Sequence, residues 1–530
     1  MKQATHHRAG VTVISMVALT LCAKALGMVR QMITASVFAA SAEGIAFAAA
    51  SRIPLAIFDM LFSTAIIGSF LPIYRGHLLS DGKRAKDFSS SFLTLILAVT
   101  AAAALMGVAL ARPILALAAP SLSAETMALA VTLLRIMFPS VIFAGAAYTL
   151  IGIMQSHERF LLPASVSAIS NAVMIAYLIL TPSFDNAKTA VIGLSVTYTL
   201  SWAAQFLTLA VPLIRTHDMP RLQCPRGERE LVLAERRALP VMLGAWLIPA
   251  VTLTANALAT RVDARSTIDA SLAEDAAVVV LENAFSVFSI AGGLMTYGIC
   301  NYLFPKLAAR HASNDGDGFR RALGAGLLAS LTVALPIALA LFILADDAIR
   351  LLYLRGSFTA ELADATALAL RVLCLAMPAY GVIELLSRAA YSSERVMRPM
   401  VASLVGIATA LIFALVLHLA DAFTVTSVTL TISLALIVAA FLHLYLSRKL
   451  IGGPAFRAWL VPVSGTALSA AVMALLRAVL KKNVQIEGAF QNFMTIAIVF
   501  TLGFVVYLIW IFIFRKILFF EKPYGKEDCF

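Results

Sequence analysis

The stretch VASLVGIATALIFALVLHL, residues 401–419, contains no Asp, Glu, Lys or Arg. It is close to the ~20 apolar residues that an α-helix needs to cross a bilayer. Runs of this kind recur along the chain at 11–36, 45–73, 89–111, 126–154, 163–182, 189–214, 239–260, 274–305, 322–345, 362–390, 400–420, 423–446, 458–478 and 491–514. These runs are too long for barrel strands, and a helix satisfies its own backbone groups in lipid. The pattern predicts an all-α polytopic membrane protein with 14 transmembrane helices.

The composition of the 530-residue chain agrees with this prediction. Hydrophobic residues make up 61% and charged residues 13%, and the mean hydropathy is +0.90. A soluble protein of this length could not bury so much apolar surface. The first run is too long for the apolar core of a signal peptide, so we expect it to be retained as a helix. The net charge of +12 is typical of loops beside anionic lipid, so no nucleic-acid partner is expected.

Lys and Arg residues are distributed unevenly between the two sets of loops. With the N-terminus in the cytoplasm and the segments alternating, 26 of the 41 Lys and Arg residues fall in cytoplasmic segments. Nine fall on the other side, and the rest lie within the runs. Because cytoplasmic loops carry the excess of positive charge, this distribution predicts cytoplasmic N- and C-termini and an even number of helices.

Two segments of the chain repeat each other weakly. The motif LLRIMFP…QSHERFLLP in the first half corresponds to ALRVLCLAMP…YSSERVMRP in the second. Identical residues lie 236 positions apart at Arg135 and Arg371, Glu158 and Glu394, Arg159 and Arg395, and Pro163 and Pro399. Six helices separate the copies, so both point the same way, as in transporters with parallel repeats. We therefore predict an N-lobe of helices 1–6 (1–222), a C-lobe of helices 7–12 (223–450), and helices 13–14 with a cytoplasmic tail (451–530).

Charged residues inside the runs are candidates for function. A charge at the middle of a bilayer costs at least about 2.5–3.5 kcal/mol, so it normally faces a bundle interior or a wet cavity. These residues are Lys24, Arg30, Arg52, Asp59, Arg135, Glu282, Arg371, Glu384 and Arg388. Glu384 and Arg388 are four residues apart, which predicts an ion pair within one helix. Arg135 and Arg371 share a position in the repeat, so a structural role is at least as well supported as a functional one.

The segment LCAKALGMVRQ, residues 21–31, contains two of these charges. Lys24, Gly27 and Arg30 are three residues apart, so on a helix they share one broad face with the glycine between the cations. The glycine leaves room for a bulky group or a neighbouring backbone. The alternative is that the cations extend to a headgroup or pair with a buried carboxylate.

Arg52 adds a third cation in the second run. Pro54 follows it and bends a helix, which is tolerated beside a cavity. Three cations with only Asp59 nearby in sequence predict an anion site, and guanidinium groups suit phosphate oxygens in particular. We therefore predict Lys24, Arg30 and Arg52 as substrate-binding residues. Asp59 and Glu282 could be counter-ions or proton carriers.

Sequence signatures of enzymes are missing from the chain. There is no Walker loop, no H-E-x-x-H and no G-x-S-x-G. The five cysteines are scattered without a C-x-x-C pair, so no metal site or cofactor is expected. Transport by this protein would therefore depend on an ion gradient, the membrane potential or a downstream sink.

Several stretches resemble one known family. AKALGMVRQMITASVFAAS is similar to the first helix of the MurJ (MviN) lipid II flippase family, part of the multidrug/oligosaccharidyl-lipid/polysaccharide exporter superfamily. SFLPIYRGHLLSDGKRAKDF resembles the family's second helix and first cytoplasmic loop. ERFLLPASVSAISNAVMI, LYLRGSFTAELADATALAL and YSSERVMRP resemble later segments, and the resemblance runs from about residue 15 to 450.

The resemblance implies two lobes around a central cationic cavity, with helices 13 and 14 forming a groove that faces lipid. It implies a bacterial inner-membrane flippase for an undecaprenyl-pyrophosphate-linked peptidoglycan precursor, lipid II. Lys24 and Arg30 stand where the family has arginines that contact pyrophosphate. Membrane lipid and cell-wall synthesis proteins are the other partners that the resemblance implies.

Some positions differ from the family's pattern. Phe58 and Asp59 stand where the family has a basic pair, and Ser286 and Ser289 stand where it has an Arg and a Glu. These differences leave open a divergent paralogue or a Wzx-like flippase that moves an exopolysaccharide or O-antigen unit on a lipid carrier. An alternative of another class is a scaffold for cell-wall enzymes that transports nothing. A cationic, wet cavity would favour transport.

Overall fold

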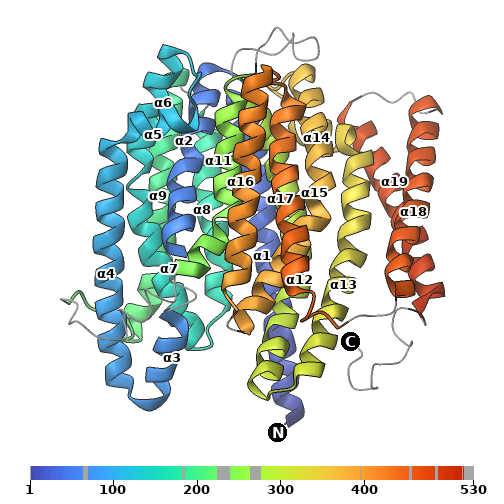
Figure 1. Ribbon diagram of the computed structural model, residues 1–530. Coiled ribbons are helices and arrows are strands. Elements are labelled where there is room, and N and C mark those ends of the chain that lie inside the picture. The colour runs from blue at the N-terminus through green and yellow to red at the C-terminus, as the bar shows by residue number, and fades with distance from the viewer. Residues whose placement is uncertain are drawn as a thin grey trace. The chain divides into compact units, whose positions relative to one another are not determined.

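The computed structural model describes residues 2–63, 70–181, 186–223, 239–262, 276–393, 395–452, 456–483, 488–515 and 517. Within these residues it consists of helices and contains no strand (Figure 1). Twelve helices are long and apolar enough to cross a membrane, and a bent pair, Leu239–Ala245 with Leu247–Ala259, is a thirteenth candidate. Helix α1, Lys2–Phe38, covers the first predicted run. The predicted all-α polytopic membrane fold is confirmed, and each predicted run overlaps a described helix, although residues 64–69 of the second run and 274–275 of the eighth lie outside the described part of the chain.

The chain divides into two compact units, one made mainly of residues 1–262 and the other mainly of residues 280–530. The first unit contains α1, α2 (Ala42–Phe58), the π-helix η1 (Asp59–Ser63), α3 (Leu71–Ser80), α4 (Gly82–Ala109), α5 (Ala111–Ala118), α6 (Ala124–Met137), α7 (Ser140–Ser156), α8 (Leu161–Leu180), α9 (Ala187–Arg215) and α11 (Leu247–Ala259). The second contains most of α12 (Ala276–Ala312), then α13 (Gly316–Ile343), α14 (Ala345–Tyr353), α15 (Ala360–Ser392), α16 (Met397–Ala420), α17 (Val425–Ser447), α18 (Phe456–Asn483) and α19 (Ala489–Ile513).

The helix boundaries follow the sequence repeat. Ala124 and Ala360 begin α6 and α15, and Leu161 and Met397 begin α8 and α16; both pairs are 236 positions apart. The same offset relates the N-caps Ser123 and Thr359, whose hydroxyls each accept a backbone N–H of the first turn. A capping hydroxyl satisfies one of the unpaired N–H groups at a helix start. Matching caps therefore begin matching helices in the two units. Of the repeated residues, Glu394 lies outside the described part of the chain.

Three of the predicted runs are interrupted in the structure. The run at 126–154 changes from α6 to α7 at Pro139, which lacks the N–H that a continuous helix needs. The run at 45–73 changes from α2 to the π-helix η1 at Asp59. The run at 239–260 bends by 44° at Trp246. Hydropathy predicts a span but does not reveal such breaks.

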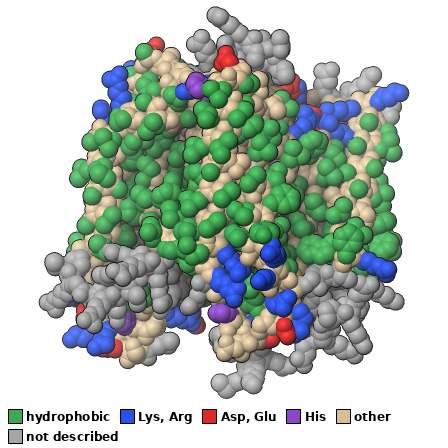
Figure 2. All heavy atoms as spheres, viewed as in Figure 1, with side chains coloured by type: hydrophobic (Ala, Val, Ile, Leu, Met, Phe, Trp, Pro, Cys, Tyr) green, Lys and Arg blue, Asp and Glu red, His purple; other side chains and the backbone are tan. Residues whose placement is uncertain are grey.

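Small residues allow the helices of each unit to approach closely. A Cβ added at Gly107 of α4 would lie 2.2 Å from the ring of Phe138, and one at Gly193 of α9 would lie 2.0 Å from the Tyr177 hydroxyl. The hydrophobic effect contributes little between helices in lipid, so close van der Waals packing of this kind stabilises their association. Apolar side chains cover the middle of the helices, whereas Lys and Arg side chains gather toward helix ends (Figure 2).

Candidate functional site

The face of α1 that contains Lys24, Gly27 and Arg30 lies against α8. Asn171 of α8 donates a hydrogen bond from Nδ2 to the Ala23 carbonyl oxygen, with 3.2 Å between the atoms. A Cβ added at Gly27 would lie 3.3 Å from the same Nδ2 atom. The close approach expected at Gly27 is therefore found, and the group that approaches is a side chain amide.

Arg30 is directed toward the same neighbouring helix. Its Nη1 atom lies 3.3 Å from Sδ of Met174 in α8, a weak hydrogen-bond acceptor. Lys24 and Arg30 are both half-buried within the first unit. A half-buried cation on a transmembrane helix interacts more strongly with an anion than it would in water, because the local dielectric constant is lower.

Arg52 and Asp59 lie on the second span of the same unit. Both are half-buried, with Pro54 inside α2 between them and Asp59 as the first residue of the π-helix η1. A π-turn in a helix often marks a functional site. The change at Asp59 thus places a carboxylate at an irregular point of the backbone.

Trp246 was not predicted as part of this region. It interrupts the bent span before α11, and its indole Nε1 donates a hydrogen bond of 2.7 Å to the carbonyl oxygen of Met60 in η1. Two helix breaks far apart in sequence therefore meet through one hydrogen bond. The only signal in the sequence is a tryptophan within an otherwise aliphatic run, and that signal is weak.

Glu282, the remaining predicted site residue, belongs to the second unit. It is half-buried on α12, one turn before Ser286, whose carbonyl oxygen accepts a hydrogen bond from the Ser289 hydroxyl. The other four predicted residues belong to the first unit, Lys24 and Arg30 on α1 and Arg52 and Asp59 on its second span. Phe58, at one of the positions that differ from the family pattern, is fully buried against Tyr148 with 5.0 Å between ring centroids.

Two cavities of the second unit, about 330 and 340 Å³, are lined by none of the five predicted site residues. Two of the predicted intramembrane arginines of that unit form ion pairs. Arg388 Nη2 lies 3.5 Å from Glu384 Oε2, which confirms the predicted ion pair within α15. Arg371 is paired with Asp346, and this contact supports a structural role for the repeated arginine.

Comparison with known proteins identifies the family. The family model described as "Lipid II flippase MurJ" matches residues 34–501, extending past the expected limit near 450. The probable lipid II flippase MurJ of Bdellovibrio bacteriovorus is 27% identical over 395 residues, covering 73% of each chain. The lipid II flippase MurJ of Burkholderia cenocepacia is 25% identical over 389 residues, covering 72% of each.

Solved structures share the fold. A structure titled "Lipid II flippase MurJ, inward closed conformation" aligns with a TM-score of 0.75 at 20% identity, over 95% of this chain and all of that one. An inward-facing multidrug resistance MATE transporter of the MOP superfamily aligns with a TM-score of 0.65 at 14% identity, over 82% of this chain and 97% of that one. Because the family model matches most of its length, this chain belongs to the lipid II flippase MurJ family.

Proposed function

We propose that this protein is a flippase that moves lipid II, a peptidoglycan precursor linked to a polyprenyl pyrophosphate, across the bacterial inner membrane. Membership of the MurJ family, whose members are transporters and not enzymes, supports this function. The structural observation that carries it is the pair of half-buried cations, Lys24 and Arg30, on either side of Gly27 where α8 approaches α1.

The proposed chemistry is electrostatic capture of the pyrophosphate. Arg30 and Arg52 each offer a planar fork of N–H donors that matches two phosphate oxygens, and Lys24 adds a compact charge. These groups bind most strongly where water is excluded. Asp59 limits the net positive charge of the region, and Asp59 and Glu282 are the candidates for coupling transport to an ion.

The proposed transport cycle uses the two-lobe organisation. The N-lobe (1–222) and C-lobe (223–450) would rock against each other around the bound head group, as in other transporters built from repeats. Helices 13 and 14 (451–530) would accommodate the lipid tail. The excess of Lys and Arg in alternate loops supports cytoplasmic N- and C-termini. Enzymes that consume lipid II are the cell-wall partners expected on the outer side.

Complementation of a bacterial strain depleted of its own lipid II flippase tests the proposal. We expect the unmutated gene to restore growth and cell shape, and to restore access of an externally added lipid II-degrading enzyme to labelled lipid II in spheroplasts. An inserted, normally expressed protein that fails in both assays would contradict lipid II transport. Altered capsule or exopolysaccharide in the native deletion strain would then identify a Wzx-like substrate. Loss of wall synthesis without a transport defect would identify a scaffold.

A further inference from the structure

A cluster of charges connects three helices of the second unit. Asp346 and Asp347 lie in the first turn of α14, just after α13 ends at Ile343. Arg477 of α18 donates from Nε to Asp347 (2.6 Å) and from Nη2 to Asp346 (2.7 Å). Arg371 of α15 donates to Asp346 across 2.5 Å, and Lys481 Nζ lies 3.4 Å from Asp347.

This cluster lies where two candidate membrane spans end. The α13 span ends at Ile343 and the α18 span ends at Lys482, and Arg371 reaches Asp346 from eleven residues after the start of the α15 span at Ala360. Charges at such a position meet the headgroup layer of a bilayer. The cluster is therefore at the boundary between hydrocarbon and water.

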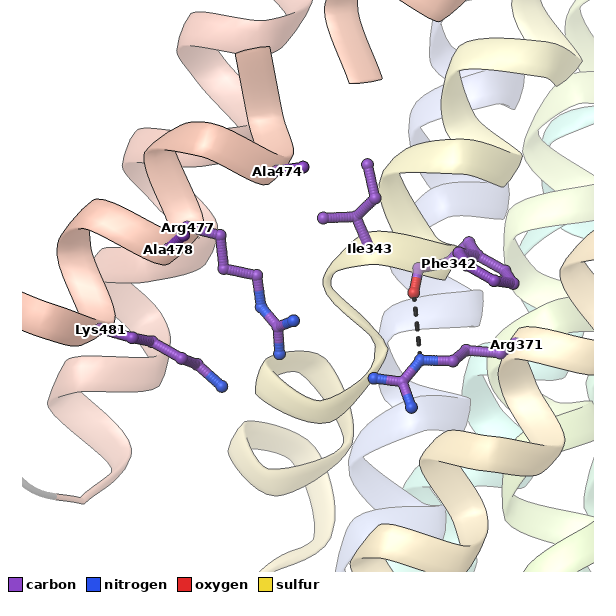
Figure 3. A pocket seen from close by; sticks show the side chains of 7 residues that line it. All are labelled: Phe342, Ile343, Arg371, Ala474, Arg477, Ala478 and Lys481. Carbon is purple, nitrogen blue, oxygen red and sulfur yellow. Dashed lines mark hydrogen bonds between the residues drawn. The ribbon is translucent and has the colours of Figure 1, made fainter. Parts of the chain in front are cut away.

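A cavity of about 330 Å³ opens beside the cluster. Arg477 and Lys481 project into it from α18, and Arg371 projects into it from α15 (Figure 3). Phe342 and Ile343 line it from the end of α13, while Ala474 and Ala478 leave space along α18. One water occupies ~30 Å³ of liquid, so the cavity has room for a phosphate group together with the glycerol units of a lipid headgroup.

The charges of this cluster do not balance. Three cations face two carboxylates, and Asp347 is only 2% exposed, so its charge is directed into the protein. Lys481 is the most accessible member at 48% exposed, followed by Arg371 at 28%, whereas Arg477 at 19% is less exposed than Asp346 at 24%. Two ion pairs from Arg477 are sufficient to attach α18 to α14. Attachment of α18 to α14 does not require the exposed Lys481 or the adjacent cavity.

We propose that this pocket binds the phosphate of an anionic phospholipid. The phosphodiester would accept charge-assisted hydrogen bonds from Lys481 and the two arginines, and its negative charge would neutralise the surplus positive charge. Leu475 and Val479, neighbouring residues on α18, are 66% and 46% exposed and offer an apolar surface for acyl chains. The site is separate from the residues proposed to bind the transported pyrophosphate, so it can be tested without a transport assay.

Native mass spectrometry of the full-length, delipidated protein in detergent tests this proposal. Phosphatidylglycerol and phosphatidylcholine are added separately, because both contain a phosphate but only the first is anionic. We expect the unmutated protein to retain one phosphatidylglycerol in preference to phosphatidylcholine. Lys481→Gln is expected to reduce that retention roughly fivefold, the effect of one cation near an anionic headgroup.

Matched variants separate the pocket from general surface charge. Lys482→Gln removes the same charge from the next residue, which does not line the cavity, and should leave retention unchanged. Ala478→Trp fills the cavity without changing its charge and should abolish retention, whereas Ala471→Trp on the same helix should not. If Ala478→Trp does not fold, the two lysine variants still decide the question.

Three results would overturn the proposal. Equal retention of the two lipids would show that the anionic charge is not recognised. Equal effects of Lys481→Gln and Lys482→Gln would show that the pocket is not the binding site. Displacement of phosphatidylglycerol by millimolar inorganic phosphate, or by undecaprenyl pyrophosphate at equal concentration, would assign the pocket to the free ion or to the transported substrate.

Discussion

Asn171 Nδ2 of α8 donates a hydrogen bond to the Ala23 carbonyl oxygen of α1, and Gly27 leaves the space in which the amide lies. The bond fixes the cationic face of α1 against α8 at the level of Lys24. Interhelical hydrogen bonds in membranes contribute about 0.6 kcal/mol on average. We therefore expect this bond to affect the position of Lys24 and Arg30 more than the stability of the fold.

Asn171→Ala tests this positioning role. We expect a small loss of thermal stability in detergent and a clear loss of complementation, because α1 is no longer fixed beside α8. Ser170→Ala is the matched control, since the Ser170 hydroxyl donates across 3.0 Å to Ser201 of α9 and not to α1. Similar melting temperatures with impaired complementation only for Asn171→Ala would support the prediction, and equal complementation by both variants would contradict it.

Substitution of the two α1 cations tests the anion site directly. We expect Lys24→Ala and Arg30→Ala each to abolish complementation with normal expression, because each removes a charge from a region of low dielectric constant. Lys24→Arg should retain function, since it restores a fork of donors at the same position. Arg84→Ala, in the first turn of α4 where the side chain is 76% exposed, serves as the control. Full complementation by both alanine variants would exclude the proposed site.

Gly107→Ala tests the close packing of α4. The added Cβ would lie 2.2 Å from the Phe138 ring, so either the ring or the helix has to move. Overpacking of this kind typically costs about 1–3 kcal/mol. Gly76→Ala adds the same atom where nothing lies within 4 Å, and it should leave the melting temperature nearly unchanged or raise it. Equal melting temperatures for the two variants would contradict the packing seen at Phe138.

The Asp346 cluster predicts a dependence of stability on acid. Burial alone would raise the pKa of Asp346, but the hydrogen bonds and charges of Arg477 and Arg371 outweigh it and lower the pKa below its usual 3.8. A lowered pKa in the folded state means that the contribution to stability is fully present above the unfolded pKa. It is lost as the pH falls through the lower folded pKa. Asp346→Asn should therefore reduce the fall in melting temperature below pH 4, and an unchanged fall would exclude this group.

The sequence was sufficient for the features that depend on local pattern. Apolar length predicted the spans, the 236-residue offset predicted which helix starts correspond, and the spacing of Glu384 and Arg388 predicted their ion pair. Contacts between distant helices could not be predicted in this way. The pairing of Asp347 with Arg477 joins positions 130 residues apart, and hydropathy contains no information on which faces of two helices meet.

The contact between Trp246 and Met60 also joins distant helices, and it can be used to test the role of the two helix breaks. Trp246→Phe keeps most of the apolar volume but removes the N–H that bonds the Met60 carbonyl oxygen across 2.7 Å. The bond is only partly buried, so its loss should cost less than the ~1–3 kcal/mol of a fully buried unsatisfied group, and we expect a modestly lower melting temperature. Trp202→Phe makes the same chemical change on α9 of the same unit and should have a smaller effect on the melting temperature.

The same pair of variants tests function. Asp59, a candidate for coupling transport to an ion, is the first residue of η1, so loss of the bond to η1 should also impair complementation at a temperature where both variants remain folded. Equal complementation by the two variants at that temperature would show that the junction stabilises the fold without contributing to transport.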